Sequence, residues 1–230
     1  MRKAQLSDEV ASYVRELIMS GQLREGGHVR LEHLAKQLGV SLTPVREGLL
    51  TLRGEGFVQL EPRRGFIVSP LSRQDVDDLF SIQAGVAGEL AARAAVQITP
   101  EQVDEVAELQ QSLEAAALAD DRDLIEQTNY RFHRAINLSA GSRKLTWMLM
   151  TVARYAPRRF YATIHGWQQA SVDDHRSIVA ALRDGSAEDA SEAMKRHILH
   201  AGGLLIAHLE DTGFWDSTEP DADTITAAPA

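Results

Sequence analysis

Residues 30–70 decide the fold of this 230-residue chain: RLEHLAKQLGVSLTPVREGLLTLRGEGFVQLEPRRGFIVSP. Apolar residues in its first part recur at helical spacing, and Gly39 follows them at a position suited to left-handed backbone. Ser41 is a suitable N-cap for a second helix, and Pro44 fits the first turn because no N–H is needed there. Two β-rich runs follow, at residues 57–60 and 66–68. The stretch predicts a winged helix-turn-helix.

The second helix and the hairpin turn carry the basic residues that a winged helix presents to DNA. Arg46 and Arg53 lie about two helical turns apart and share one face, which would enter the major groove. The basic turn would contact the phosphate backbone or the minor groove. An alternative leaves Ser41 as a cap only and pairs Arg53 with Glu47 or Glu55. The predicted DNA contacts are Ser41, Thr43, Pro44, Arg46, Arg53, Arg63, Arg64 and Gly65.

Composition and charge narrow the classes of protein. Residues 1–70 hold ten Lys/Arg and eight Asp/Glu, a net charge of +2, whereas the remainder holds fourteen and twenty-five, a net charge of −11. This asymmetry indicates that only the N-terminal part approaches DNA. The absence of cysteine excludes disulfides, thiol catalysis and cysteine-rich zinc sites. No apolar run approaches the roughly 20 residues of a membrane span, and no signal-peptide core is present, so a cytoplasmic protein without membrane contact is expected.

Helical patterns account for most of the rest of the chain. A helix over 5–20, capped by Ser7, and a short strand over 28–31 precede the decisive stretch. After a linker at 69–72, six helices are predicted: 75–97, 99–119, 121–139, 142–165 (kinked at Pro157), 172–184 and 187–209. The fold class is therefore mainly α, with an N-terminal winged helix-turn-helix and a C-terminal all-α antiparallel bundle. The expected domains are 1–70 for DNA binding, 71–210 for effector binding and dimerisation, and a disordered acidic tail at 211–230.

Four polar residues of the predicted bundle have the types that metal sites use. Asn129 and His133 are spaced i, i+4 and share one helix face, while His175 and His197 lie on two later helices. Three imidazoles and an amide oxygen could converge on a divalent ion in the bundle core. Spacing alone leaves open the alternative that each histidine is a hydrogen-bonded or surface residue.

The run VSLTPVREGLLTLRGEGFVQLEPRRGFIV, residues 40–68, resembles the DNA-binding domain of GntR-type bacterial transcription regulators. Two positions depart from the family pattern. Leu42 stands where the family often has Arg, and Gly48 where it often has Ala. The resemblance implies binding of double-stranded operator DNA, whereas Leu42 removes one expected DNA contact.

The second part of the chain resembles the FCD effector domain of the FadR subfamily, so that the resemblance extends over roughly residues 5–210. The family's metal motif corresponds here to Asn129-Tyr-Arg-Phe-His133, Asp174-His175 and the His197 of MKRHI, with Asn129 in place of the usual Asp. The resemblance implies a divalent cofactor, zinc, nickel or manganese. A neutral Asn129 would lower metal affinity and leave the ion its full double charge, which favours an anionic effector.

The effector implied by the resemblance is a small organic acid, such as a sugar acid. Where the family often has Arg and Glu in the first helix of this domain, the chain has Gln83 and Ala87. A glutamine cannot form the charged fork that an arginine forms with a carboxylate. The candidate effector contacts are Gln83, Arg131, Arg154 and Arg158.

These features together favour a ligand-responsive, homodimeric transcription regulator, with repression the more common behaviour of the family. Dimerisation is expected because two half-sites double the DNA contacts. A metal-sensing regulator and a ligand-independent dimeric regulator are the alternatives. An enzyme is not expected, because Asp174 is the one candidate general base and adjacent helical residues point about 100° apart.

Overall fold

The computed structural model describes residues 2–155, 161 and 164–216. The described chain forms two compact units. One unit contains the residues up to Ser72 together with those from Leu209 onward, and the other contains Arg73–His208. No helix among the described residues is long and apolar enough to cross a membrane.

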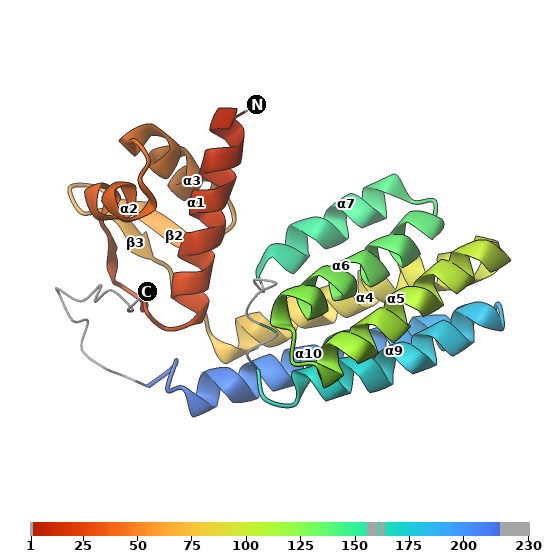
Figure 1. Cartoon of the computed structure of the whole chain (residues 1–230). Coiled ribbons are helices and arrows are strands. Elements are labelled where there is room, and N and C mark those ends of the chain that lie inside the picture. Colours follow the sequence, from red (N-terminus) through yellow and green to blue (C-terminus); the bar gives the residue numbers. More distant parts are fainter. Residues whose placement is uncertain (1, 156–160, 162–163, 217–230) are drawn as a thin grey trace. The chain divides into compact units, whose positions relative to one another are not determined.

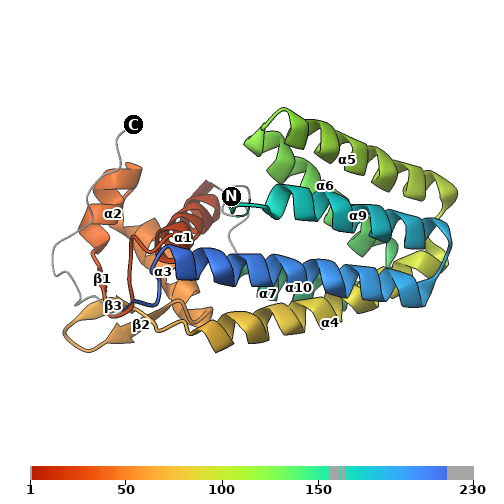
Figure 2. The ribbon, with the colours of Figure 1, turned by 90° about the horizontal axis from the view of Figure 1, so that it is seen from below.

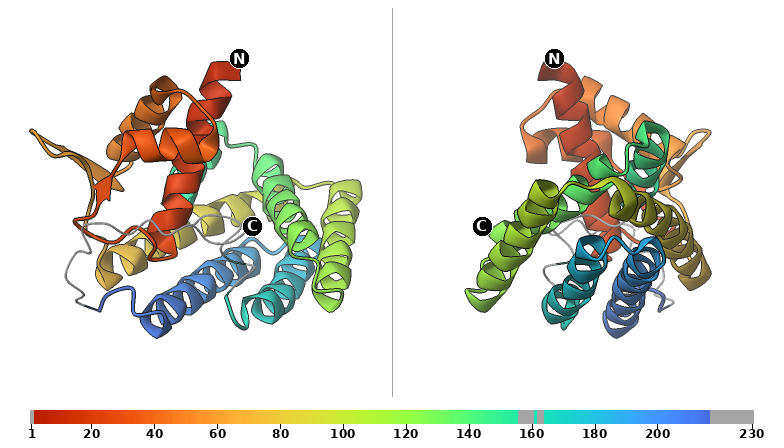
Figure 3. Two further views of the ribbon diagram at one scale, coloured as in Figure 1. Left: turned by 60° about the vertical axis from the view of Figure 1, so that its left-hand side comes forward. Right: turned by 90° about the vertical axis from the view of Figure 1, so that its right-hand side faces the viewer.

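The first unit is a winged helix-turn-helix (Figure 1). Its sheet has the order β1-β3-β2 with antiparallel neighbours, and Ile67 lies opposite both His28 and Gln59. The β2–β3 hairpin projects as the wing (Figure 3). The elements are α1 Arg2–Met19, β1 His28–Val29, α2 Leu31–Leu38, α3 Leu42–Gly54, β2 Val58–Glu61 and β3 Gly65–Val68. The winged fold predicted from residues 30–70 is therefore confirmed.

Local signals place the two helices of this motif. Gly39 adopts the left-handed conformation, with φ of 64°, and its N–H donates to the carbonyl oxygens of Ala35 and Lys36 at the end of α2. Ser41 occupies the N-cap of α3, as predicted. The predicted cap at Ser7 is wrong, because α1 already begins at Arg2 and Ser7 lies inside the helix. The backbone is already helical before Ser7, so no cap is needed there.

Close approach of α1 to α3 explains why residue 48 is glycine. A Cβ atom at Gly48 would lie 2.8 Å from the carbonyl oxygen of Ser7 and 3.0 Å from Val10 Cγ1. Both contacts are shorter than van der Waals separation, and a backbone oxygen cannot rotate away. The departure from the usual family alanine therefore permits a tighter helix pair in this chain.

Gly48→Ala is expected to destabilise the winged unit by about 1–3 kcal/mol, because the added methyl group forces the two helices apart. The higher helix propensity of alanine offsets at most about 1 kcal/mol of this. Thermal melting checks the prediction. Gly54→Ala is the matched control, since its Cβ would meet nothing within 4 Å. A Gly48→Ala variant as stable as Gly54→Ala would contradict the close packing.

The second unit is an antiparallel helical bundle (Figure 2). Alanines of α4 pack against Phe132, Ile136, Ile178 and Met194 in its core. In this unit α5 lies against α6 and α9, and α4 lies against α6, α7 and α9. Its elements are α4 Arg73–Gln97, α5 Pro100–Leu118, α6 Arg122–Ser139, α7 Arg143–Val152, the 3-10 turn Ala153–Tyr155, α9 Trp167–Arg183 and α10 Ala187–Asp211, of which the residues up to His208 belong here.

The start of α5 follows the signal in the sequence, whereas the end of α7 differs from the prediction. At α5 the Thr99 hydroxyl accepts from the Gln102 N–H, and the Gln102 side chain accepts from the Thr99 N–H, which forms a capping box. The predicted single helix over 142–165 is wrong, because α7 ends at Val152 and a 3-10 turn follows. The predicted kink residue, Pro157, lies outside the described residues.

The helix predicted to begin at 172 begins earlier. It starts at Trp167, after Gly166 with a φ of 79°. Burial of Trp167, which is 4% exposed, accounts for the extra turn.

The residues after α10 pack on the winged unit to which they belong. The indole Nε1–H of Trp215 donates to the Leu71 carbonyl oxygen at 2.8 Å, and Arg24 Nη1 donates to the Gly213 carbonyl oxygen at 3.3 Å. A disordered tail was predicted from residue 211 on. Within that tail, 211–216 is ordered by these contacts, and 217–230 lies outside the described residues.

Candidate nucleic-acid interface and metal centre

The recognition helix α3 presents polar and basic side chains on one exposed face. Thr43, Arg46 and Arg53 are exposed, whereas Pro44 is buried in the first turn. The Ser41 hydroxyl makes no capping hydrogen bond to the helix. An exposed hydroxyl beside the N-terminal N–H groups of a helix is suited to a phosphate.

An ion pair anchors the far end of α3. The guanidinium of Arg15 on α1 donates to both carboxylate oxygens of Glu55, at 2.7–2.9 Å, and both side chains are 12% exposed. A bidentate, half-buried pair of this kind holds geometry better than a surface pair. It positions the helix that carries Arg46 and Arg53.

The turn between β2 and β3 combines left-handed backbone conformations with polar contacts. Arg63 adopts φ of 67° and Gly65 adopts φ of 79°, which turns the chain tightly between β2 and β3. The His28 ring lies with Nδ1 3.1 Å from the Arg64 carbonyl oxygen, so β1 supports the turn. Arg64 Nη1 donates to Glu61 at 2.8 Å, but the arginine is 55% exposed and the pair is weak. Both arginines are therefore presented at the tip of the wing.

Three histidines from three helices converge inside the bundle. His133 lies on α6, His175 on α9 and His197 on α10, and one nitrogen of each lies within 4.8 Å of the others. The two Nε2 atoms of His133 and His197 are 3.2 Å apart. Helical periodicity carries no information on distances between helices, and the structure brings the three histidines together in one cluster.

Asn129 is the candidate source of an oxygen ligand for this cluster. It lies one helical turn before His133, and its buried Oδ1 has no hydrogen-bond partner among the described residues. A buried polar atom without a partner is unfavourable, which indicates a group that the oxygen would bind. Three imidazole nitrogens and one amide oxygen fit zinc, nickel or manganese. The residues present thus suit the metal that FCD domains can bind.

Burial keeps the imidazoles of His133 and His175 neutral by lowering their pKa values. Burial, and then the neighbouring His197, lower the pKa of His133 to about 3. Burial also lowers the pKa of His175 well below its usual value, with smaller contributions from His197 and His133. Metal binding requires the unprotonated ring, so protons compete little with a metal near neutral pH.

Two further polar residues contact the ring nitrogens that face away from the cluster. Gln110 Oε1 lies 3.0 Å from His175 Nδ1, and Asp174 Oδ2 lies 3.5 Å from His197 Nδ1. The same Asp174 oxygen lies 3.0 Å from His200 Nδ1. Sequence reasoning missed Gln110 altogether, and its one signal was a polar residue among the buried positions of α5.

Of the predicted effector contacts, Gln83 alone lies inside the bundle among the described residues. It is 5% exposed, and its Nε2 has no hydrogen-bond partner in the described part of the chain. Arg131 and Arg154 are exposed, and Arg158 lies outside the described residues.

The packing of α4 against α10 shows the depth of Gln83 in the bundle. A Cβ at Gly88 would meet Lys195, and one at Gly202 would meet Phe80. The two helices are therefore antiparallel. Gln83 lies between Phe80 and Gly88 on α4. Its level in the bundle is therefore between those of Gly202 and Lys195 on α10, close to that of His197.

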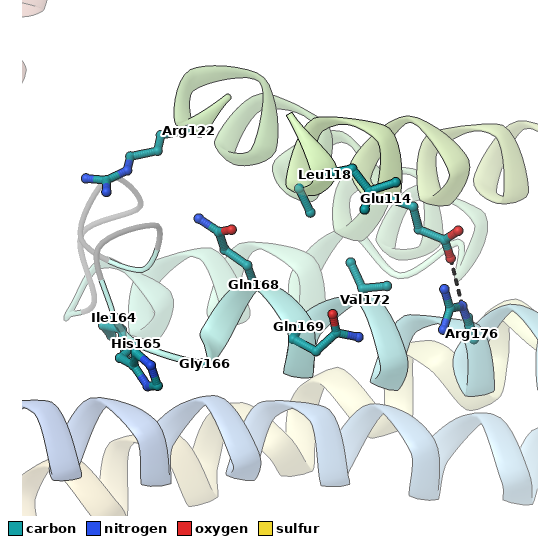
Figure 4. Close-up of a pocket in the computed structure, with 11 residues that line it drawn as sticks. Glu114, Leu118, Arg122, Ile164, His165, Gly166, Gln168, Gln169, Val172 and Arg176 are labelled. Atoms are coloured by element: carbon teal, nitrogen blue, oxygen red, sulfur yellow. Dashed lines mark hydrogen bonds and ion pairs between the residues drawn. The ribbon is translucent and has the colours of Figure 1, made fainter. Parts of the chain in front are cut away.

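A surface groove lies between the end of α5 and the start of α9 (Figure 4). Its volume is about 510 Å³, and its lining includes Glu114, Val172 and Arg176. Arg176 Nε donates to Glu114 at 2.8 Å across it. None of the three clustered histidines lines this groove, so the groove and the cluster are separate features of the bundle.

Comparison with known proteins agrees with both units. The family described as "Bacterial regulatory proteins, gntR family" matches residues 6–68, and the FCD domain family matches residues 78–200. The chain belongs to the GntR family of transcription regulators, with an FCD effector domain of the FadR-like type. It is therefore a DNA-binding regulator, and the prediction that it is not an enzyme is confirmed by its families and relatives.

Individual relatives cover nearly the whole chain. The HTH-type transcriptional regulator McbR of Escherichia coli K12 is 29% identical over 206 residues, covering 86% of this chain and 93% of its own. The "Probable D-xylose utilization operon transcriptional repressor" of Paenarthrobacter nicotinovorans is 28% identical over 195 residues, covering 82% and 85%. The solved structure of E. coli McbR/YncC aligns with a TM-score of 0.69 at 24% identity, covering 88% and 98%. Lar, which controls the agr system of Listeria monocytogenes, aligns with a TM-score of 0.57 at 18% identity, covering 86% and 95%.

Proposed function

We propose that this regulator is a homodimeric repressor that holds a divalent metal at Asn129, His133, His175 and His197. A small carboxylate binding beside the metal weakens operator binding. The observation that carries the proposal is that two buried polar atoms accompany the histidine cluster without a hydrogen-bond partner among the described residues: Asn129 Oδ1 and Gln83 Nε2. Together they suit a polar ligand inside the FCD domain.

The charge of the site selects the class of ligand. All four metal donors are neutral, so a bound divalent ion keeps its full charge and attracts an anion. The Gln83 amide N–H group, buried in the first helix of the domain, supplies a neutral donor toward that anion. A glutamine binds an acceptor without charge, so a monocarboxylate with hydroxyl or carbonyl groups fits better than a dicarboxylate.

Repression and dimerisation are supported by different observations. The D-xylose relative is named as a repressor, and the recognition helix and wing offer the contacts of one half-site. Large apolar side chains are exposed on α6 and α7, with Trp147 64% and Leu138 57% exposed, and the adjacent residues Thr146 and Asn137 are joined by a hydrogen bond of 3.3 Å. Exposed apolar patches mark protein–protein interfaces, and a second copy of the chain is the proposed occupant.

The proposal is tested with dialysed protein and an operator selected by the protein from random duplexes. Elemental analysis is expected to find about one metal ion per chain, and a panel of small carboxylates is expected to release the DNA in the metal-loaded protein only. Reversal of DNA binding by a chelator alone would instead identify a metal-sensing regulator. Operator binding that no acid and no chelator changes would identify a ligand-independent dimeric regulator.

Asn129→Asp sharpens this test, because the change adds one negative charge and keeps the size of the side chain. Tighter metal binding and weaker response to the same carboxylate are expected, since the anion then meets a less positive ion. Gln97→Glu is the control, because it adds the same charge in the same unit, where Gln97 contacts the Ala140 carbonyl oxygen. An unchanged carboxylate response in Asn129→Asp would contradict a carboxylate bound beside the metal.

A further inference from the structure

We propose that Gln110 is a positioning residue for the metal centre: it holds His175 in the tautomer whose Nε2 lone pair faces His133 and His197. This inference rests on the proposed metal site. Helix α5 carries none of the four candidate ligands, and through Gln110 it would orient one of them, His175.

The orientation of the Gln110 amide follows from its neighbours. Its Nε2 donates to the Val172 carbonyl oxygen at 2.9 Å and to Glu114 Oε1 at 3.0 Å. A carbonyl oxygen and a carboxylate accept hydrogen bonds and cannot donate them. The opposite orientation would set oxygen against oxygen twice, so the amide nitrogen must face these two acceptors.

With the amide fixed, Oε1 is the atom that faces His175. It lies 3.0 Å from His175 Nδ1, and both residues are buried, at 4% and 0% exposure. Because an amide oxygen only accepts, Nδ1 must carry the proton. A neutral imidazole has one ring proton, so Nε2 keeps its lone pair for the cluster.

Other contacts of the His175 ring agree with this tautomer. Ser171 Oγ is 3.5 Å from Nε2, the outer limit of a hydrogen bond, and its hydroxyl can rotate away. The Phe132 ring stacks on the imidazole with centroids 3.9 Å apart and an angle of 5° between planes. Phe132 thus sets the plane of the ring, while Gln110 sets its rotation within that plane and its proton.

Asp174 occupies the equivalent place at His197. Its Oδ2 is 3.5 Å from His197 Nδ1, and the opposite nitrogen of that ring lies 3.2 Å from His133 Nε2. This distance is at the outer limit of a hydrogen bond, and Nδ1 has no formed hydrogen bond within the described part of the chain. An amide on one histidine and a carboxylate on another is the arrangement that orients metal-binding imidazoles in proteins.

A purely structural role for Gln110 makes a different prediction. Its hydrogen bond to the Val172 carbonyl oxygen joins α5 to α9, and loss of this bond alone would lower stability. The tautomer of His175 would then be the same with or without Gln110. The state of the ring therefore separates the two roles.

The experiment records long-range ¹⁵N–¹H correlation spectra of the histidine rings in the metal-free, full-length protein, together with zinc affinity by competition with a chelator. Wild-type His175 is expected to carry its proton on Nδ1. Gln110→Met, which keeps the length and removes the acceptor, is expected to show a mixture of tautomers and about 10- to 100-fold weaker zinc binding. Gln97→Met is the matched control, since it removes a side-chain amide bonded to Ala140 away from the cluster.

Each outcome either supports or contradicts the proposed role of Gln110. A wild-type His175 protonated on Nε2 overturns the proposal, and this holds even if Gln110→Met does not fold. Zinc binding in Gln110→Met as tight as in Gln97→Met also overturns it. Wild-type protein that binds no zinc, nickel or manganese overturns the metal centre itself, whichever tautomer is seen, and so separates the failure of the proposed function from the failure of this inference.

Discussion

His197→Ala is expected to weaken zinc binding by about 100-fold or more, since structural zinc sites with four ligands gain about 10–16 kcal/mol in total, or about 3 kcal/mol for each ligand. His197 is 3% exposed and its Nε2 lies 3.2 Å from His133 Nε2, so its loss removes one of the three imidazoles that would surround the ion. The loss is expected in both equilibrium affinity and retained metal after dialysis.

Chelator competition measures the affinity of this variant, and elemental analysis measures its metal content. His165→Ala is the control, because His165 is exposed in the same unit and outside the cluster. Removal of the His197 ring also leaves a cavity, so circular dichroism must first show that the helices persist. Near-stoichiometric metal in a folded His197→Ala protein would mean that the histidines do not form the site.

The sequence predicted the members of the histidine cluster better than the residues that support them. Asn129 and His133 share a helix face because their spacing is i, i+4, which local geometry alone determines. The approach of His175 and His197 depends on how α9 and α10 pack, and helical periodicity gives no inter-helix register. Family resemblance supplied that information. Gln110 lies in no motif, and its role emerges only when the partners of its side chain are known.

The helix ends show the same contrast between features that local sequence signals predict and features that depend on packing. The winged motif was predictable because its signals are local: a left-handed glycine after α2 and a proline in the first turn of α3. The end of α7 at Val152 and the start of α9 at Trp167 were missed. Pro157 was interpreted as a kink within one long helix, whereas α7 already ends at Val152, and burial of Trp167 explains the early start of α9.

The two departures from the family pattern, Gly48 and Leu42, have different expected consequences. Gly48 is buried against Ser7 and Val10, so its effect is on the stability of the helix pair. Leu42 is 45% exposed at the start of α3, the helix that is predicted to contact DNA. A leucine there supplies no charge to a phosphate, which places more of the binding energy on the remaining arginines.

Arg46→Ala is therefore expected to weaken operator binding by about 1–3 kcal/mol, or roughly 5- to 150-fold. Arg46 is exposed on α3, while its neighbours Pro44 and Val45 are buried and fix the direction of the helix. The dependence of affinity on salt tells which kind of contact is lost. A phosphate contact lowers the salt slope by about one, whereas a base contact leaves the slope nearly unchanged and relaxes sequence preference at one position.

Fluorescence anisotropy at several salt concentrations measures both quantities for Arg46→Ala and for Arg64→Ala in the wing. Arg93→Ala is the control, since Arg93 is an exposed arginine of the helical unit that pairs with Glu89 on its own helix. The wing variant is expected to change the slope with little change in sequence preference, because its residue sits at a hairpin tip and reaches the backbone. If affinity and slope in both variants match those of Arg93→Ala, these arginines do not contact the operator, and α3 must bind through Ser41, Thr43 and Arg53.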